Sequence, residues 1–215
     1  FNLNWLTPAA SNHSVWQTRF ARLLKDLGLE TELASRLANW FNDESQADDY
    51  YSSLDLPYRA AYRACSHTSE LLLVEGMDMV TYKTLLPYIT CLPATSQLNV
   101  NTALDKVLAS LGDDFGLDGA MAVIAERGED GIGSVSDFWA IAEVVPFTDT
   151  SKSDSGNSSG NTDENNDSEN ASDSKNTSQK HSWDQNDFTV WTEYFQIFTR
   201  IDLGTSGEWI ATSQF

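Results

Sequence analysis

The sequence predicts an α+β protein in which a large helical region interrupts a smaller antiparallel sheet. Residues 7–149 carry a succession of apolar patterns with the helical period and few breaks, whereas residues 183–215 and residues 1–6 alternate as strands do. The strand-like regions lie at opposite ends of the chain. We therefore expect one sheet portion built from 1–6 and 183–215, with residues 7–149 inserted between them as a helical domain.

The first helix is predicted from apolar residues at i, i+4, i+7, i+8 and i+11, which share one helical face. These residues are Trp16, Phe20, Leu23, Leu24 and Leu27. Ser14 is the predicted N-cap, and Gly28 the residue that stops the helix. A second helix is predicted from Leu33, Leu37, Trp40 and Phe41, and further helices near 69–75, 78–87, 101–111, 118–127 and 136–142.

Residues 150–182 differ in composition from the rest of the chain. Within 151–180 there are nine Ser and six Asn, and Ala171 is the sole apolar side chain. Such a segment buries too little apolar surface to offset the entropy of ordering. We expect residues 150–182 to be a flexible acidic loop.

The C-terminal region is predicted to form a β-hairpin. Phe195, Ile197, Thr199, Ile201 and Leu203 fall on one face of an extended segment, and 204–207 can form the turn that lets 208–215 pair back. Two strands alone are marginally stable in water. Residues 1–6 are therefore the candidate for a third strand of the same sheet.

The charge of the chain argues against nucleic acid as a partner. The formal net charge is −19, from 32 acidic and 13 basic residues, whereas binding to nucleic acid depends on Lys and Arg that neutralise phosphates. Catalysis is not expected either. His13, His67 and His181 are far apart in the sequence, and the chain has no nucleophile motif, zinc-protease motif or phosphate-binding loop.

The acidic segment 42–49 is a candidate calcium site. Calcium takes six to eight oxygen ligands, and short loops rich in Asp, Asn and Glu supply them. The spacing differs from that of an EF-hand, and a solvated surface turn explains the same pattern. The candidate ligands are Asn42, Asp43, Glu44, Asp48 and Asp49.

The two cysteines, Cys65 and Cys91, do not have the spacing of a zinc site. On the sequence alone they form either a disulfide or two free thiols. No stretch approaches the ~18–20 apolar residues that span a bilayer.

Residues 98–138 resemble the helix-hairpin-helix module of DNA-uptake and repair proteins. In that module a Gly-rich hairpin and nearby basic residues bind a phosphate. Here the hairpin carries Asp113, Asp114 and Asp118, and Lys106 and Arg127 are the only basic residues between 99 and 143. A nucleic-acid-binding module is therefore the disfavoured alternative, because like charges repel.

The order of motifs along the whole chain resembles the K-type minor pseudopilins of bacterial type II secretion systems, also called the general secretion pathway protein K family. The resembling segments are Phe1–Asn4, Trp40–Glu44, Ala47–Tyr51, Leu56–Arg59, Ser69–Val74 with Gly76, Leu86–Thr90 with Leu92–Pro93, Asn99–Ala103, Ser136–Phe138 and Tyr194–Phe195. In the calcium loop, Asn42 and Glu44 stand where the family has Asp, and the loop is shorter. Asp48 and Asp49 are its best-matching ligands.

This resemblance implies a pilin-type antiparallel sheet with a large inserted α-domain that contains a helix-hairpin-helix, or SAM-like, unit. It implies a structural subunit at the tip of the pseudopilus, assembled with I-type and J-type minor pseudopilins. Secreted proteins are a further candidate class of partner. The expected location is the periplasmic face of the inner membrane, with membrane contact only through an N-terminal helix absent from this chain. The resemblance also favours calcium at 42–49 and, because the periplasm is oxidising, a Cys65–Cys91 disulfide.

Overall fold

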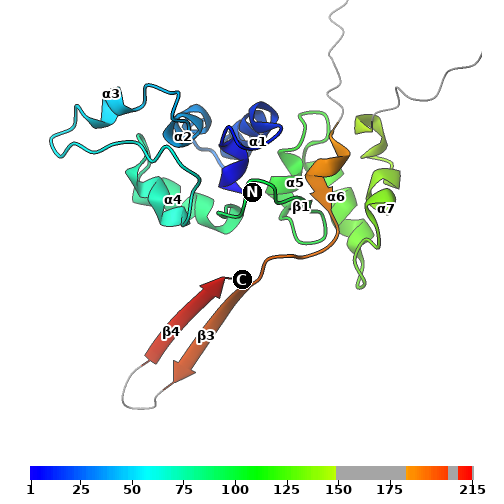
Figure 1. Cartoon of the computed structure of the whole chain (residues 1–215). Helices are drawn as coiled ribbons and strands as arrows, with labels where there is room; N and C mark the ends of the chain where they lie inside the picture. Colours follow the sequence, from blue (N-terminus) through cyan, green and yellow to red (C-terminus); the bar gives the residue numbers. More distant parts are fainter. Residues whose placement is uncertain (149–182, 203–207, 215) are drawn as a thin grey trace, which may run out of the picture.

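Helices and a C-terminal β-hairpin make up the fold, which confirms the α+β class (Figure 1). The structure is a computed structural model that describes residues 1–148, 183–202 and 208–214. The predicted flexible loop at 150–182 lies outside the described residues. The helices are α1 (His13–Asp26), α2 (Leu33–Phe41), α3 (Asp48–Tyr51), α4 (Met79–Leu85), α5 (Asp105–Ala109), α6 (Gly116–Arg127) and α7 (Val135–Ala140). Short 3-10 turns are η1 (Leu3–Leu6), η2 (Thr68–Leu73), η3 (Leu86–Tyr88), η4 (Val145–Phe147) and η5 (Gln185–Asp187).

The helices α1 and α2 form as the apolar spacing predicts, and their apolar faces are buried. Gly28 follows α1 with φ +70°, a backbone conformation that glycine adopts without steric cost. Ser14 is not the N-cap, however, because α1 begins at His13, two residues earlier than this prediction, and Asn12 occupies the cap position.

The N-terminal segment is not a strand of the hairpin's sheet, so this prediction was wrong. Leu3–Leu6 forms η1, and Asn2 makes an isolated parallel bridge with Thr90. Asn2 and Asn4 are buried because they bond main-chain groups. The Asn4 amide nitrogen donates to the carbonyls of Cys65 (2.9 Å) and Leu92 (2.8 Å), and the Asn2 oxygen accepts from the Leu92 N–H (2.9 Å). The polar residues of the alternating pattern therefore face protein, not solvent.

The segment after residue 182 also departs from the predicted sheet portion, because it first packs against the helices. The Trp183 ring stacks on that of Phe147 with centroids 4.6 Å apart. The main-chain N–H of Trp183 donates to the Phe147 carbonyl (2.9 Å). Asp187 forms an ion pair with the buried Arg19 of α1 (3.0 Å). β2 (Phe188–Thr189) then pairs in parallel with β1 (Leu98–Asn99).

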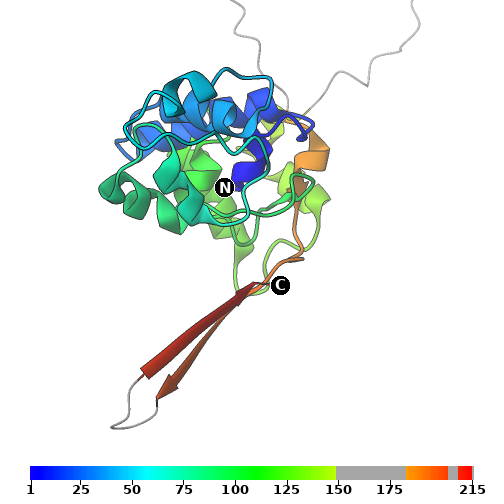
Figure 2. The ribbon, with the colours of Figure 1, turned by 60° about the vertical axis from the view of Figure 1, so that its left-hand side comes forward.

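The predicted C-terminal hairpin is present. β3 (Gln196–Asp202) and β4 (Glu208–Gln214) pair antiparallel, from Gln196 opposite Gln214 to Asp202 opposite Glu208. The predicted turn at 204–207 lies outside the described residues. The hairpin extends away from the helical body, and residues 190–195 connect the two (Figures 1 and 2). No helix among the described residues is long and apolar enough to cross a membrane.

Candidate functional site

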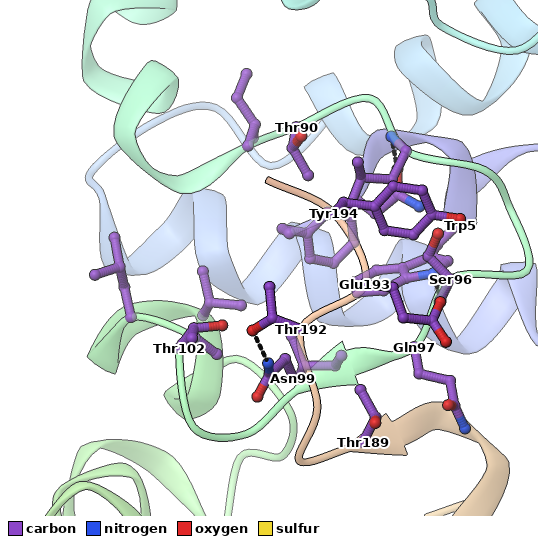
Figure 3. A pocket seen from close by; sticks show the side chains of 18 of the residues that line it. Trp5, Thr90, Ser96, Gln97, Asn99, Thr102, Thr189, Thr192, Glu193 and Tyr194 are labelled. Atoms are coloured by element: carbon purple, nitrogen blue, oxygen red, sulfur yellow. Dashed lines mark hydrogen bonds between the residues drawn. The ribbon is translucent and has the colours of Figure 1, made fainter. Parts of the chain in front are cut away.

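A cleft of about 270 Å³ lies where the C-terminal segment crosses the middle of the chain. Its walls come from residues 1–5, 87–107 and 189–194, which are distant in the sequence. Figure 3 shows Trp5, Ser96, Glu193 and Tyr194 toward one end of the cleft, with Asn99, Thr102 and Thr192 toward the other. We call residues 191–195, which lead from β2 to β3, the strap.

Side-chain amides hold the C-terminal segment against the cleft. The Asn99 amide nitrogen donates to the Thr192 hydroxyl (2.8 Å), and that of Asn101 donates to the Val190 carbonyl (3.1 Å). The Gln97 amide nitrogen donates to the Asn186 carbonyl (2.9 Å). The position of the strap is therefore specified by the segment around β1.

The cleft combines apolar walls with a few polar groups. Trp5 is buried and stacks on Trp16 with ring centroids 4.0 Å apart, which fixes one wall. Ser96 lines the cleft, and its hydroxyl is buried without a hydrogen-bond partner among the described residues. The strap, by contrast, is exposed: Trp191 is 72% exposed and Phe195 58%. Such a combination is typical of a binding site.

The candidate calcium ligands are not brought together. Among the described residues, no three His, Cys, Asp or Glu side chains are placed to hold a metal ion. The Asp48 carboxylate accepts from Arg59 Nε (2.8 Å) and the Ala60 N–H (2.8 Å), and the Asn42 side-chain oxygen accepts from the Glu44 N–H (3.0 Å). The Arg59 guanidinium holds the pKa of Asp48 below its ordinary value. In this arrangement Asp48 is already engaged by Arg59 and Ala60, and calcium at 42–49 stays a prediction.

The Cys65–Cys91 disulfide is confirmed, with a Cα–Cα distance of 5.5 Å. It closes a loop with a sequence separation of 26 residues. The Cys65 carbonyl also accepts from the Asn4 amide nitrogen, and the Cys65 N–H donates to the Asn4 amide oxygen. The disulfide and the N-terminal segment therefore stabilise the same region.

The other candidate side chains serve the fold. His67 Nδ1 accepts from the Ser69 N–H (3.2 Å), and Glu70 accepts from the His67 N–H (3.1 Å), which together form a capping box for η2. Lys106 Nζ donates to the Asp26 carbonyl at the end of α1 (2.9 Å), and the Arg127 guanidinium donates to the carbonyls of Val100 and Ala103 (2.8 and 2.6 Å). These two bases are thus engaged within the protein rather than presented to a phosphate.

Sequence reasoning did not identify the cleft. Its walls are brought together by contacts over some 90 residues, such as the bridge between Asn2 and Thr90 and the bond between Asn99 and Thr192. The available local signal was the aromatic run of the strap, Trp191, Tyr194 and Phe195, next to polar residues.

Comparisons with known proteins agree with one another. Two family profiles described as "Type II secretion system (T2SS), protein K" match residues 1–94 and 98–154. The chain is 36% identical over 151 residues to type II secretion system protein K of Pseudomonas aeruginosa (strain PAO1), covering 64% of this chain and 44% of that protein. It is 30% identical over 179 residues to that of Pectobacterium carotovorum subsp. carotovorum, covering 74% and 52%. The chain therefore spans about half the length of these curated relatives.

A solved structure has the same fold. The chain superposes with a TM-score of 0.71 and 20% identity on a chain of the GspK-GspI-GspJ complex from the type 2 secretion system of enterotoxigenic Escherichia coli. The match covers 100% of this chain and 69% of that one.

Proposed function

The chain belongs to the protein K family of the type II secretion system, and from this premise we propose that it is a non-catalytic structural subunit at the tip of the pseudopilus. In this role it assembles with the I-type and J-type minor pseudopilins during protein export. The observation that carries the proposal is the pair of family matches over 1–94 and 98–154. The fold shared with a chain of a K–I–J complex supports it.

The proposed location is the periplasmic face of the inner membrane, where the protein would contact the membrane through an N-terminal helix outside this sequence. The Cys65–Cys91 disulfide supports an oxidising compartment. In the proposed architecture β3 and β4 belong to a pilin-type sheet, and the helical body is the inserted domain. The packed α5–α6 pair would be its helix-hairpin-helix-like unit, used for packing rather than for binding phosphate.

Nothing in the described residues favours the nucleic-acid alternative. Lys106 and Arg127, the bases nearest the predicted hairpin, donate to main-chain carbonyls within the protein. The net charge of −19 would also oppose the approach of a polyanion.

Size-exclusion chromatography tests this function directly. The purified chain is mixed with the periplasmic domains of the I-type and J-type pseudopilins of the same bacterium. We expect one earlier-eluting peak that contains all three proteins, because a tip subunit works by protein–protein contact. The control is an unrelated protein of similar size and acidity, which should elute alone. Separate elution of this chain at micromolar concentration and moderate salt would contradict the proposal.

A further inference from the structure

We propose that Asn4 positions Cys65 and Cys91 for disulfide formation, so that docking of residues 1–6 and oxidation of the two thiols favour each other. One buried amide bonds the main chain beside both cysteines. The contacts that carry this inference lie within the described residues and are independent of the proposed role at the pseudopilus tip. The oxidant required is a disulfide compound or a thiol–disulfide oxidoreductase.

The Asn4 side chain spans the two chain segments that the disulfide joins. Its amide oxygen accepts from the main-chain N–H of Cys65 (2.6 Å), and its amide nitrogen donates to the Cys65 carbonyl (2.9 Å). The same nitrogen donates to the carbonyl of Leu92, the residue after Cys91 (2.8 Å). Asn4 therefore holds the main chain at Cys65 and the main chain next to Cys91 in one arrangement, in which the Cα atoms of the two cysteines are 5.5 Å apart.

Neighbouring contacts fix the segment that carries Asn4. The Asn2 amide oxygen accepts from the Leu92 N–H (2.9 Å), and the Leu3 N–H donates to the Thr90 carbonyl (2.8 Å). Asn2 and Asn4 are 1% and 3% exposed, and a buried amide that loses its partners destabilises the fold. The N-terminal segment therefore docks fully only when both cysteine-bearing segments are in place.

Disulfide formation takes two steps, and Asn4 acts on the second. The thiolate of one cysteine attacks the disulfide of the oxidant, which forms a mixed disulfide and releases one oxidant thiolate. The thiolate of the other cysteine attacks the protein sulfur of that mixed disulfide, which closes the Cys65–Cys91 bond and releases the second oxidant thiolate. Two electrons and the two thiol protons pass to the oxidant, which leaves as two thiols. Because the second step is intramolecular, it depends on how close together the two cysteines are held.

The first test measures the equilibrium of the protein with oxidised and reduced glutathione, which gives the effective concentration of one cysteine thiol at the other. The variant is Asn4→Ala, with folding of the reduced form checked by circular dichroism. We expect the effective concentration to fall roughly tenfold or more, because three hydrogen bonds that hold the two segments together are lost.

The matched control is Asn101→Ala. The Asn101 amide also makes three bonds to main chain, since it donates to the carbonyls of Ile132 (3.0 Å) and Val190 (3.1 Å) and accepts from the Ile132 N–H (2.8 Å). Its partners lie in segments other than those that carry the cysteines. We therefore expect the glutathione equilibrium of this variant to match that of the parent.

The second test measures the reciprocal effect by hydrogen exchange and does not require Asn4→Ala to fold. A coupling between two equilibria acts equally in both directions, so the disulfide should also favour docking of the N-terminal segment. With both cysteines replaced by serine, we expect the N–H groups of Leu3 and Leu92 to exchange roughly tenfold faster than in the oxidised parent. The Ile132 N–H, which bonds Asn101, should change much less.

Three outcomes would overturn the proposal. The first is an unchanged glutathione equilibrium in folded Asn4→Ala, and the second is an equal decrease in Asn101→Ala, which would reflect general stability alone. The third is exchange at Leu3 and Leu92 that stays at the parent rate, or that rises no more than exchange at Ile132, when the disulfide is removed.

Discussion

At the scale of single residues, Arg19 is the most consequential charged side chain. It is 1% exposed, pairs with Asp187 at 3.0 Å and lies 4.3 Å over the Trp16 ring. Burial lowers the pKa of the Arg19 guanidinium, and the Asp187 carboxylate opposes this shift. The pair joins α1 to the segment that precedes β2.

Removing the negative charge should therefore destabilise the protein strongly. We expect Asp187→Asn to lower the free energy of unfolding by about 3 kcal/mol, since it leaves a buried guanidinium without its counter-charge. The matched control is Asp113→Asn, which breaks the 2.8 Å pair between Asp113 and Arg22 on the same helix. Because Asp113 is largely exposed, its loss should cost less than about 1 kcal/mol. If urea unfolding shows that the two substitutions lower stability equally, the Arg19–Asp187 pair is no more important than the Arg22–Asp113 pair, and the prediction is wrong.

Asp48 is the second residue whose charge can be tested. Its pKa is lowered chiefly by the hydrogen bond from Arg59, so the ion pair stabilises the fold above the ordinary Asp pKa, and this contribution is lost as pH falls through the lowered value. We expect Arg59→Gln to raise the pKa of Asp48 in an NMR titration of the carboxyl carbons. Arg36→Gln, which breaks the distant pair with Glu30, should leave it unchanged.

Arg59→Gln also tests the calcium prediction. Calcium and Arg59 would compete for the Asp48 carboxylate, so we expect calcium to bind Arg59→Gln more tightly and to raise its melting temperature more than that of the unmodified chain. If neither protein responds to calcium relative to chelator, residues 42–49 are a surface loop and the metal prediction is wrong.

At the scale of elements, the disulfide and the N-terminal segment act on the same part of the chain. Cys65 is joined to Cys91 and also bonds Asn4, while the neighbouring residues of Cys91, Thr90 and Leu92, bond residues 1–4. The loop from Cys65 to Cys91, which contains η2, α4 and η3, is thus closed twice, covalently and by hydrogen bonds.

Removing the disulfide should reduce the stability of the protein but leave the loop from Cys65 to Cys91 folded. We expect replacement of both cysteines by serine to lower the free energy of unfolding by about 3 kcal/mol, since the 26-residue separation constrains the unfolded chain. Thermal unfolding of the variant, and of the parent with and without reductant, measures this. A variant as stable as the oxidised parent would mean that the Asn2 and Asn4 bonds alone determine the closure.

Local periodicity predicted some elements well and failed at others for physical reasons. The helices α1 and α2 follow from apolar spacing, because a buried helical face is a property of one segment. The alternation in residues 1–6 is a weaker signal, since it assumes that polar residues face water. Asn2 and Asn4 are buried, and their amides bond loop carbonyls that no local pattern can identify.

At the scale of the whole molecule, the family and the α+β class could be predicted from the order of motifs along the chain. The cleft could not, because it forms only when residues 1–5, 87–107 and 189–194 meet. The prediction that the sheet portion begins at residue 183 was also wrong. Residues 183–190 carry Trp183 and Phe188 into the core of the helical body, and the hairpin begins only at Gln196.

The stacked rings of Phe147 and Trp183 have a consequence for how much the connection between them can change. The two rings and the hydrogen bond between their main chains hold the ends of the 149–182 segment at one point of the fold. Lengthening a connection whose ends are already held together costs little stability, because each doubling of loop length raises the entropic cost of closing the loop by only about 0.6 kcal/mol. The sequence between these two aromatic residues can therefore be lengthened, shortened or replaced at little cost to the stability of the core on either side.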